Sequence, residues 1–168
     1  MKSLLIGCGN SRAKKVIWDG RKEWGDLVTI DMNPHCKPDV VWDLEDMPLP
    51  FDDGEFDELA AYDVLEHQGR QGDWRGWFDE FREYHRILKP GGIFGIIVPI
   101  GADALADPGH TRFITKNYFG FLCDSFYVDN LAKGAQVTDY RWWKDYNWEI
   151  LHLSQQGDHH LAVVLRKA

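Results

Sequence analysis

The sequence predicts an α/β fold: a Rossmann-like, mostly parallel, doubly wound sheet with an antiparallel hairpin strand at its C-terminal end. Short apolar runs rich in Val, Ile and Leu alternate with helical patterns, as in parallel sheets whose strands are buried between helices. A glycine pair follows the first of these runs, at a position where open α/β sheets bind ligands. Near the C-terminus, two strand-like runs flank a short turn, which indicates a hairpin.

The expected strands are short apolar runs bounded by turn residues. Five of them are predicted for the parallel part of the sheet, at residues 3–6, 27–31, 40–43, 58–62 and 93–99. Two more are predicted at residues 148–154 and 159–166, joined by the turn 155–158. This hairpin would close an otherwise parallel sheet.

One helix is strongly indicated between residues 73 and 88. Its apolar residues recur at helical spacing, with charges on the other side: Trp74, Trp77, Phe78, Phe81 and Leu88. The run Lys89-Pro90-Gly91-Gly92 ends the helix. A weaker pattern predicts a second helix at 115–123, within an irregular, aromatic-rich segment (100–147) that we expect to form a cap over a site.

Length and composition predict a single globular domain over residues 1–168. The chain is 44% hydrophobic and 14% aromatic, which excludes a disordered protein. Without an apolar run long enough to cross a bilayer or to act as a signal peptide, we expect a cytoplasmic location and no membrane partner. Three cysteines without a CxxC pair support neither a disulfide framework nor a structural zinc site.

The charge balance disfavours nucleic acid as a partner. The net charge is −8, and the stretch from Asp43 to Glu58 holds eight acidic residues and no Lys or Arg. Such a surface repels a phosphate backbone. A small molecule is the expected partner, and a homodimer is left open.

Three neighbouring strand ends carry residues suited to an adenosine ligand. Gly7 and Gly9 follow the first strand, where glycine allows a sharp turn and the close approach of a ligand. Asp31 ends the second strand and can accept hydrogen bonds from both ribose hydroxyls. Asp43 ends the third strand, and its carboxylate and the N–H of Leu44 can bind the adenine edge. An adenosine site is therefore predicted.

Five segments occur in an order and spacing that resemble a known family: LLIGCGNS, VTIDMNP, VVWDLEDMPLPFDDGEFDEL, YDVLEH and ILKPGG. They resemble the class I S-adenosylmethionine-dependent methyltransferases, and most closely the subgroup of the ubiquinone- and menaquinone-biosynthesis enzymes (methyltransferase type 11). The resemblance extends from Leu4 to about Pro99, and the predicted hairpin fits the reversed last strand of the family. It implies methyl transfer from S-adenosyl-L-methionine to an O or N nucleophile of a small-molecule or glycan-type acceptor.

The resemblance also implies which residues contact the cofactor. It places Gly7, Cys8 and Gly9 beside the methionine part, and Tyr62 near the same part. The residues that it implies for binding the ribose hydroxyls and the adenine lie at the ends of the second and third predicted strands.

At those strand ends, the resemblance assigns the ribose hydroxyls to Asp31 and places Met32 beside the adenine. It assigns the adenine edge to Asp43 and Leu44.

Departures from the family pattern keep two alternatives open. Leu5 stands where the family has an acid that orients the amino acid end of the cofactor, and Ser11 stands at the third glycine position. These changes leave room for a non-catalytic module that binds S-adenosylmethionine or a partner. A nucleotide-linked oxidoreductase is the other alternative, which Arg12 at the third glycine of GxGxxG disfavours.

The turn after the fourth strand is the first candidate for catalysis. Some relatives with an acid-x-x-Glu-His turn bind a divalent metal, and Asp63, Glu66 and His67 match that spacing. We favour Glu66 and His67 as hydrogen-bonding residues of the turn and assign no metal. Asp63 and His67 are kept as catalytic candidates.

Residues 107–112 are the second candidate. His110 is the expected base, because the pKa of an imidazole lies near neutrality. Arg112 is expected to bind a carboxylate or phosphate of the acceptor, and the alternative is that Arg112 pairs with Asp107 and holds the loop. Trp142 is the aromatic candidate for acceptor binding. No fixed catalytic residue is required, since methyl transfer depends mainly on alignment and exclusion of water.

Overall fold

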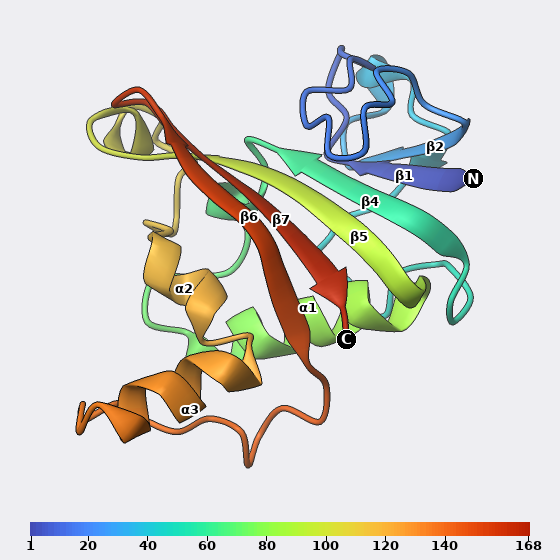
Figure 1. Cartoon of the computed structure of the whole chain (residues 1–168). Coiled ribbons are helices and arrows are strands. Elements are labelled where there is room, and N and C mark those ends of the chain that lie inside the picture. Colours follow the sequence, from blue (N-terminus) through green and yellow to red (C-terminus); the bar gives the residue numbers. More distant parts are fainter.

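The protein forms one seven-stranded sheet with its helices packed beneath it (Figure 1). The structure, a computed structural model, describes all 168 residues. The strands are β1 (Lys2–Ile6), β2 (Asp26–Asp31), β3 (Val40–Val41), β4 (Phe56–Tyr62), β5 (Leu88–Pro99), β6 (Trp148–Gln156) and β7 (His160–Lys167). The α-helices are α1 (Trp74–Ile87), α2 (Lys116–Gly120) and α3 (Asp124–Ala132), and the 3₁₀ turns are η1 (Pro34–Cys36), η2 (Leu65–His67) and η3 (Asp103–Leu105).

The strand order confirms the predicted Rossmann-like, mostly parallel sheet with an antiparallel C-terminal hairpin. It is β3-β2-β1-β4-β5-β7-β6, in which β1 to β5 are parallel and β7 is antiparallel to both β5 and β6. The chain proceeds from β1 outward to β3 and then returns to the other side of β1 as β4. The carboxyl ends of β1 and β4 therefore flank the point where the strand order reverses, which is where open α/β sheets bind ligands.

Alternation along the strands produces two cores of unequal size. In β1, Leu4 and Ile6 belong to a cluster of 28 buried residues on one face, whereas Leu5 belongs to a cluster of six on the other. Residues of α1 and the segment that holds α2 and α3 pack into the larger cluster. The C-terminal hairpin is confirmed as β6 and β7.

Helix α1 confirms the helix predicted at 73–88. Asp73 caps it by accepting a hydrogen bond from the N–H of Gly76 at 3.0 Å. The buried face of α1 includes Trp77, Phe78 and Phe81. The chain becomes extended immediately after Ile87, so that β5 begins earlier than the predicted 93–99.

No helix follows β1, and an irregular segment, residues 10–25, covers the smaller core instead. Its Val16 lies against Gly95 on β5, where a Cβ atom would come within 3.2 Å of it. The Nζ of Lys14 lies 2.9 Å from a carboxylate oxygen of Glu58 on β4, and both side chains are buried. The helices thus pack on one face of the sheet (Figure 1).

Residues 100–147, named the cap from here on, contain more helix than the sequence pattern predicts. The helix predicted at 115–123 ends at Gly120, and α3 follows it unpredicted. Helix α3 buries only Tyr127, and therefore lacks the apolar periodicity that reveals a helix in a sequence. The cap is joined to α1 by the hydroxyl of Tyr146, which donates to the Phe78 carbonyl at 2.7 Å. None of the helices is long and apolar enough to cross a bilayer.

Candidate functional site

The carboxyl ends of β1 and β2 are joined through the carboxylate of Asp31. Its Oδ2 atom accepts a hydrogen bond from the N–H of Gly9 at 2.8 Å, and its Oδ1 atom accepts one from the N–H of Asn33 at 2.8 Å. The side chain is only partly exposed. Because a carboxylate oxygen has two acceptor positions, each oxygen can still bind a further donor.

The two glycines after β1 are required for different reasons. Both have a left-handed backbone, with φ of 58° at Gly7 and 49° at Gly9. A Cβ atom at Gly7 would lie 2.4 Å from Cγ2 of Val64, in the turn after β4. A Cβ atom at Gly9 would have no neighbour within 4 Å. Gly7 therefore permits close packing of two strand ends, whereas Gly9 borders open space.

The residues after β3 lie beside the end of β2. In the strand register Asp31 pairs with Val41, and the N–H of Trp42 donates to the Asp31 carbonyl at 3.1 Å. Asp43 is exposed, and the side chain of Leu44 is buried. Met32 is 64% exposed and presents apolar surface at this edge. The backbone after β3 therefore runs beside the end of β2.

Cys8 and Tyr62 lie on the smaller core, beneath the irregular segment. The hydroxyl of Tyr62 accepts a hydrogen bond from the N–H of Val16 at 3.2 Å, and burial raises the pKa of this phenol. Burial also raises the pKa of the Cys8 thiol. Both side chains therefore contribute to packing, and Cys8 presents only its backbone to the ligand edge.

Asp63 has a left-handed backbone, with φ of 57°, which is uncommon for a residue other than glycine. Its Oδ2 lies 3.1 Å from Nζ of Lys15, and its Oδ1 lies 3.2 Å from Nε2 of His160 on β7. The contact with His160 lacks hydrogen-bond geometry, and it is an ion pair only when the imidazole carries a charge. Asp63 thus connects the irregular segment to β7.

The two catalytic candidates from the sequence meet in space. The carbonyl of Glu66 accepts hydrogen bonds from the N–H groups of Thr111 and Arg112, at 2.9 and 3.1 Å. His110 is thereby placed with its Nε2 3.8 Å from Oε1 of Glu66, and its ring centroid lies 4.7 Å from that of His67. Glu66 is 1% exposed, and burial raises its pKa to about 7.

Arg112 does not pair with Asp107, and that alternative is wrong. Its Nη2 donates to Oε2 of Glu80 on α1 at 2.6 Å, and both side chains are buried. Asp107 instead accepts a hydrogen bond from the N–H of Gly109 and so shapes its own loop. The guanidinium lies above the ring of Trp77, 5.2 Å from the centroid.

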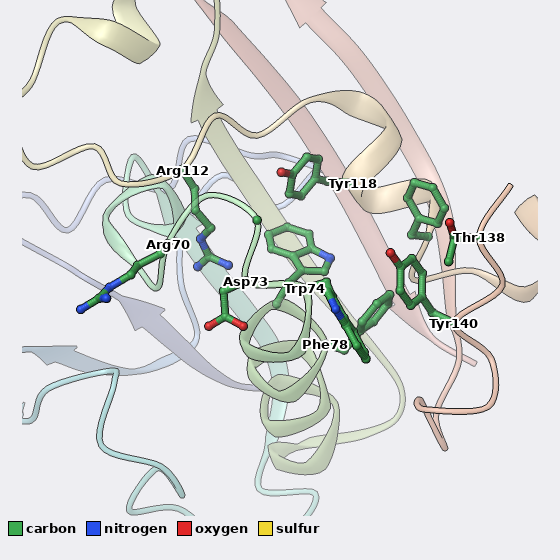
Figure 2. Close-up of a pocket in the computed structure, with 11 residues that line it drawn as sticks. Arg70, Asp73, Trp74, Phe78, Arg112, Tyr118, Thr138 and Tyr140 are labelled. Carbon is green, nitrogen blue, oxygen red and sulfur yellow. The ribbon is translucent and has the colours of Figure 1, made fainter.

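A cavity of about 290 Å³ lies between the start of α1 and the cap. Figure 2 shows aromatic side chains from α1 and from the cap around the cavity, with Arg70, Asp73 and Arg112 gathered at one side. The other lining residues are Gly72, Trp74, Trp77, Phe78, Tyr118, Phe121, Thr138 and Tyr140. The tryptophans that the sequence pattern assigns to the core thus also line a cavity.

Two observations relate this cavity to its surroundings. Trp142 does not line it: the side chain is 70% exposed and contacts the rings of Trp74 and Trp143. A neighbouring hollow of about 380 Å³ shares Arg70 and Asp73 with the cavity and reaches Leu44, after β3. The cavity is therefore linked, through this second hollow, to the segment that follows β3. Sequence analysis did not single out Arg70, which has no motif around it.

Comparison with known proteins decides the family. Residues 4–96, more than half of the chain, match the family described as a methyltransferase domain. The chain belongs to this family. The predicted enzyme class and cofactor are confirmed with it: the protein is an S-adenosylmethionine-dependent methyltransferase. No curated protein matches the sequence.

Solved methyltransferase structures share the fold across 99% of this chain. An S-adenosylmethionine-dependent methyltransferase from Archaeoglobus fulgidus is 15% identical, with a TM-score of 0.60 and 86% of its chain covered. One from Mesorhizobium loti is 17% identical (TM-score 0.56, 90% covered), and the N-methyltransferase NodS from Bradyrhizobium japonicum is 13% identical (TM-score 0.56, 85% covered). These identities are low, so the likeness shows the class I methyltransferase fold and not the acceptor.

Proposed function

We propose that this methyltransferase acts on an O or N nucleophile of a small-molecule or glycan-type acceptor. The observation that carries the proposal is the carboxylate of Asp31, held by the N–H of Gly9 after β1. A ring-lined cavity shares Arg70 and Asp73 with a hollow that reaches Leu44, after β3. Reactant and donor would then be held side by side, which supplies most of the catalysis in such a displacement.

The proposed cofactor contacts lie at the ends of β1, β2 and β3. Asp31 accepts the ribose hydroxyls on the oxygen lone pairs that its backbone donors leave free. The N–H of Leu44 has no acceptor within the chain, so it is available to an adenine ring nitrogen, with Asp43 as acceptor for the amino group. Gly9 borders the open space that the ligand needs. When bound, the sulfonium supplies an activated methyl group.

The proposed acceptor site is the cavity between α1 and the cap. Its volume is at the low end for ligand pockets, which favours a small acceptor or a single ring of a larger one. The faces of Trp74 and Tyr140 suit a flat aromatic ring or the apolar face of a sugar. Arg70 has no carboxylate partner, whereas Arg112 is neutralised by Glu80, so we assign recognition of an anionic acceptor group to Arg70 in the first place.

Alignment and exclusion of water carry the proposed catalysis. A base is needed only where the acceptor must lose a proton during transfer. The roles predicted for Asp63, His67 and His110 stay predictions, since none of the three lines the cavity. Nε2 of His110 instead faces Glu66.

Calorimetric titration with S-adenosylhomocysteine, with NAD as a comparison, tests the cofactor half of the proposal. We expect one saturable site for S-adenosylhomocysteine only, weakened in Asp31→Ala and unchanged in Asp26→Asn at the opposite end of β2. Transfer of isotope-labelled methyl to a panel of phenols, amines and sugars then tests the acceptor half. Binding without transfer to any of them would favour the alternative, a non-catalytic module.

A further inference from the structure

The carboxylate of Glu66 is buried without a partner. The residue is 1% exposed, and neither Oε1 nor Oε2 has a hydrogen-bond partner. A buried carboxylate in this condition is costly, and native proteins rarely leave one unsatisfied. Its charge calls for a cation or a set of donors in the space that both oxygens face.

Two imidazoles face the same space with their hydrogen-bonding roles already fixed. Nδ1 of His67 lies 3.1 Å from the Gly109 carbonyl, and Nδ1 of His110 lies 3.1 Å from the Ala104 carbonyl. A carbonyl only accepts hydrogen bonds, so each Nδ1 carries the proton and each neutral ring keeps its lone pair on Nε2. This arrangement, with Nδ1–H held by a backbone carbonyl, is the one that orients histidines as metal ligands.

We propose that Glu66, His67 and His110 bind one divalent transition-metal ion of the Zn²⁺ type. One ligand atom from each residue lies within 4.8 Å of the others, and Nε2 of His110 is 3.8 Å from Oε1 of Glu66. Tetrahedral zinc with bonds of about 2.0–2.2 Å places its ligand atoms about 3.3–3.6 Å apart, so the cluster must contract modestly. The exposed ring of His67 can supply that movement.

This ligand set differs from the one that the spacing of the turn suggests. Asp63 is paired with Lys15 and does not belong to the group whose ligand atoms lie within 4.8 Å of one another. The third ligand comes instead from His110, in the cap. Two imidazoles and a carboxylate suit zinc and its neighbours rather than magnesium, which prefers oxygen ligands.

The ion would join the turn after β4 to the cap. The two segments already meet through the backbone at Glu66, Thr111 and Arg112. A metal bond from His110 would add a second connection next to Arg112, which lines the cavity. Three protein ligands leave a fourth position for water, on the side of exposed His67. The proposed role is to hold the cap over the cavity.

Titration of chelator-treated protein with Zn²⁺, and separately with Co²⁺ followed by visible absorption, tests the site. We expect one equivalent bound, tetrahedral Co²⁺ bands and a higher Tm. Glu66→Gln, His67→Gln and His110→Gln should each weaken binding at least tenfold and abolish the Tm shift. Asp63→Asn and His152→Gln, an exposed histidine on β6, should bind within twofold of the wild type.

Three results would overturn the proposal: no saturable binding by the wild type, binding unaffected by all three ligand substitutions, or binding lost in Asp63→Asn but kept in His110→Gln. Glu66→Gln preserves the shape of the side chain, and far-UV circular dichroism identifies any variant that fails to fold. Titration of the same variants with S-adenosylhomocysteine separates this site from the cofactor site. Variants that lose zinc should retain cofactor affinity.

Discussion

The N–H of Gly9 donates to Oδ2 of Asp31 at 2.8 Å, and this bond joins the first two strands at the edge where the cofactor is proposed to bind. The bond fixes one carboxylate oxygen, and the N–H of Asn33 fixes the other. The carboxylate is therefore oriented before any ligand arrives. Such preorganisation lowers the entropic cost of binding.

Replacing Asp31 should weaken binding of S-adenosylhomocysteine in proportion to the acceptors removed. Asp31→Ala removes both, and at about 1.5 kcal/mol or more for each bond to a charged group the loss is roughly a hundredfold. Asp31→Asn keeps one acceptor and should lose roughly tenfold. Calorimetry measures both, with Asp26→Asn as the matched control. Equal affinity in wild type and Asp31→Ala would refute a ribose contact here.

Alanine at Gly7 should mainly lower the stability of the fold, whereas alanine at Gly9 should mainly weaken cofactor binding. At Gly7 the new methyl group collides with Val64 and the backbone is strained, so we expect a loss of about 2–4 kcal/mol in the free energy of unfolding. At Gly9 only the backbone is strained, for about 1 kcal/mol, but the methyl group enters the proposed ligand space. Urea unfolding and calorimetry on both variants separate the effects. A Gly9→Ala variant with unchanged cofactor affinity would contradict the assignment.

The sheet could be predicted because its signal is local. In β1 the neighbours Leu4 and Leu5 are both buried, as expected for a strand covered on both faces, and β4 and β5 show the same pattern. Helix α3 was not predicted because it buries only Tyr127 and so shows no apolar periodicity in the sequence. The irregular segment is also invisible to periodicity, since its contacts come from single residues such as Lys14 and Val16.

In the candidate site, too, the residues at strand ends could be predicted from the sequence, whereas the contacts made by the cap could not. Asp31 follows its strand directly, so strand ends alone placed it near Gly9. The approach of His110 to Glu66, and the pairing of Arg112 with Glu80, depend on how the cap folds back on α1. Spacing in the sequence carries no information on such contacts, which is why Asp107 was a reasonable but wrong partner for Arg112.

The buried pair of Arg112 and Glu80 should respond asymmetrically to substitution. Arg112→Met leaves the Glu80 carboxylate buried without its cation and should cost about 3–5 kcal/mol in the free energy of unfolding. Adding Glu80→Met in the same protein should recover much of that loss, because no uncompensated charge is left. Urea unfolding of the wild type, both single variants and the double variant measures the cycle. A double variant no more stable than Arg112→Met would contradict this account.

Such a result bears on any test of acceptor binding. An Arg112 variant that loses activity has also lost a buried ion pair, so its activity must be compared at matched stability. Arg70→Ala avoids the difficulty, since Arg70 is exposed and has no carboxylate partner. We expect it to raise KM for an anionic acceptor with little change in Tm.

His85 should make the protein less stable in mild acid. Its ring packs against Tyr146 and Trp148, and its Nε2 is buried without a partner. Burial, followed by the charge of Lys167, lowers the pKa of His85 from 6.5 to about 4. The unfolded chain therefore binds a proton at higher pH than the folded one. The stabilising effect of the neutral ring is complete above pH 6.5 and is lost as the pH falls toward 4.

The difference in unfolding free energy between wild type and His85→Phe, measured from pH 4 to pH 8, isolates this effect. Other groups titrate in both proteins and cancel in the difference, including Glu66, whose raised pKa gives a slope of opposite sign between pH 4.5 and about 7. Phenylalanine can pack on the same two rings, so we expect His85→Phe to gain on the wild type as the pH falls below 6.5. A difference that stays constant across the range would mean that the folded protein accommodates the His85 imidazolium as readily as water does.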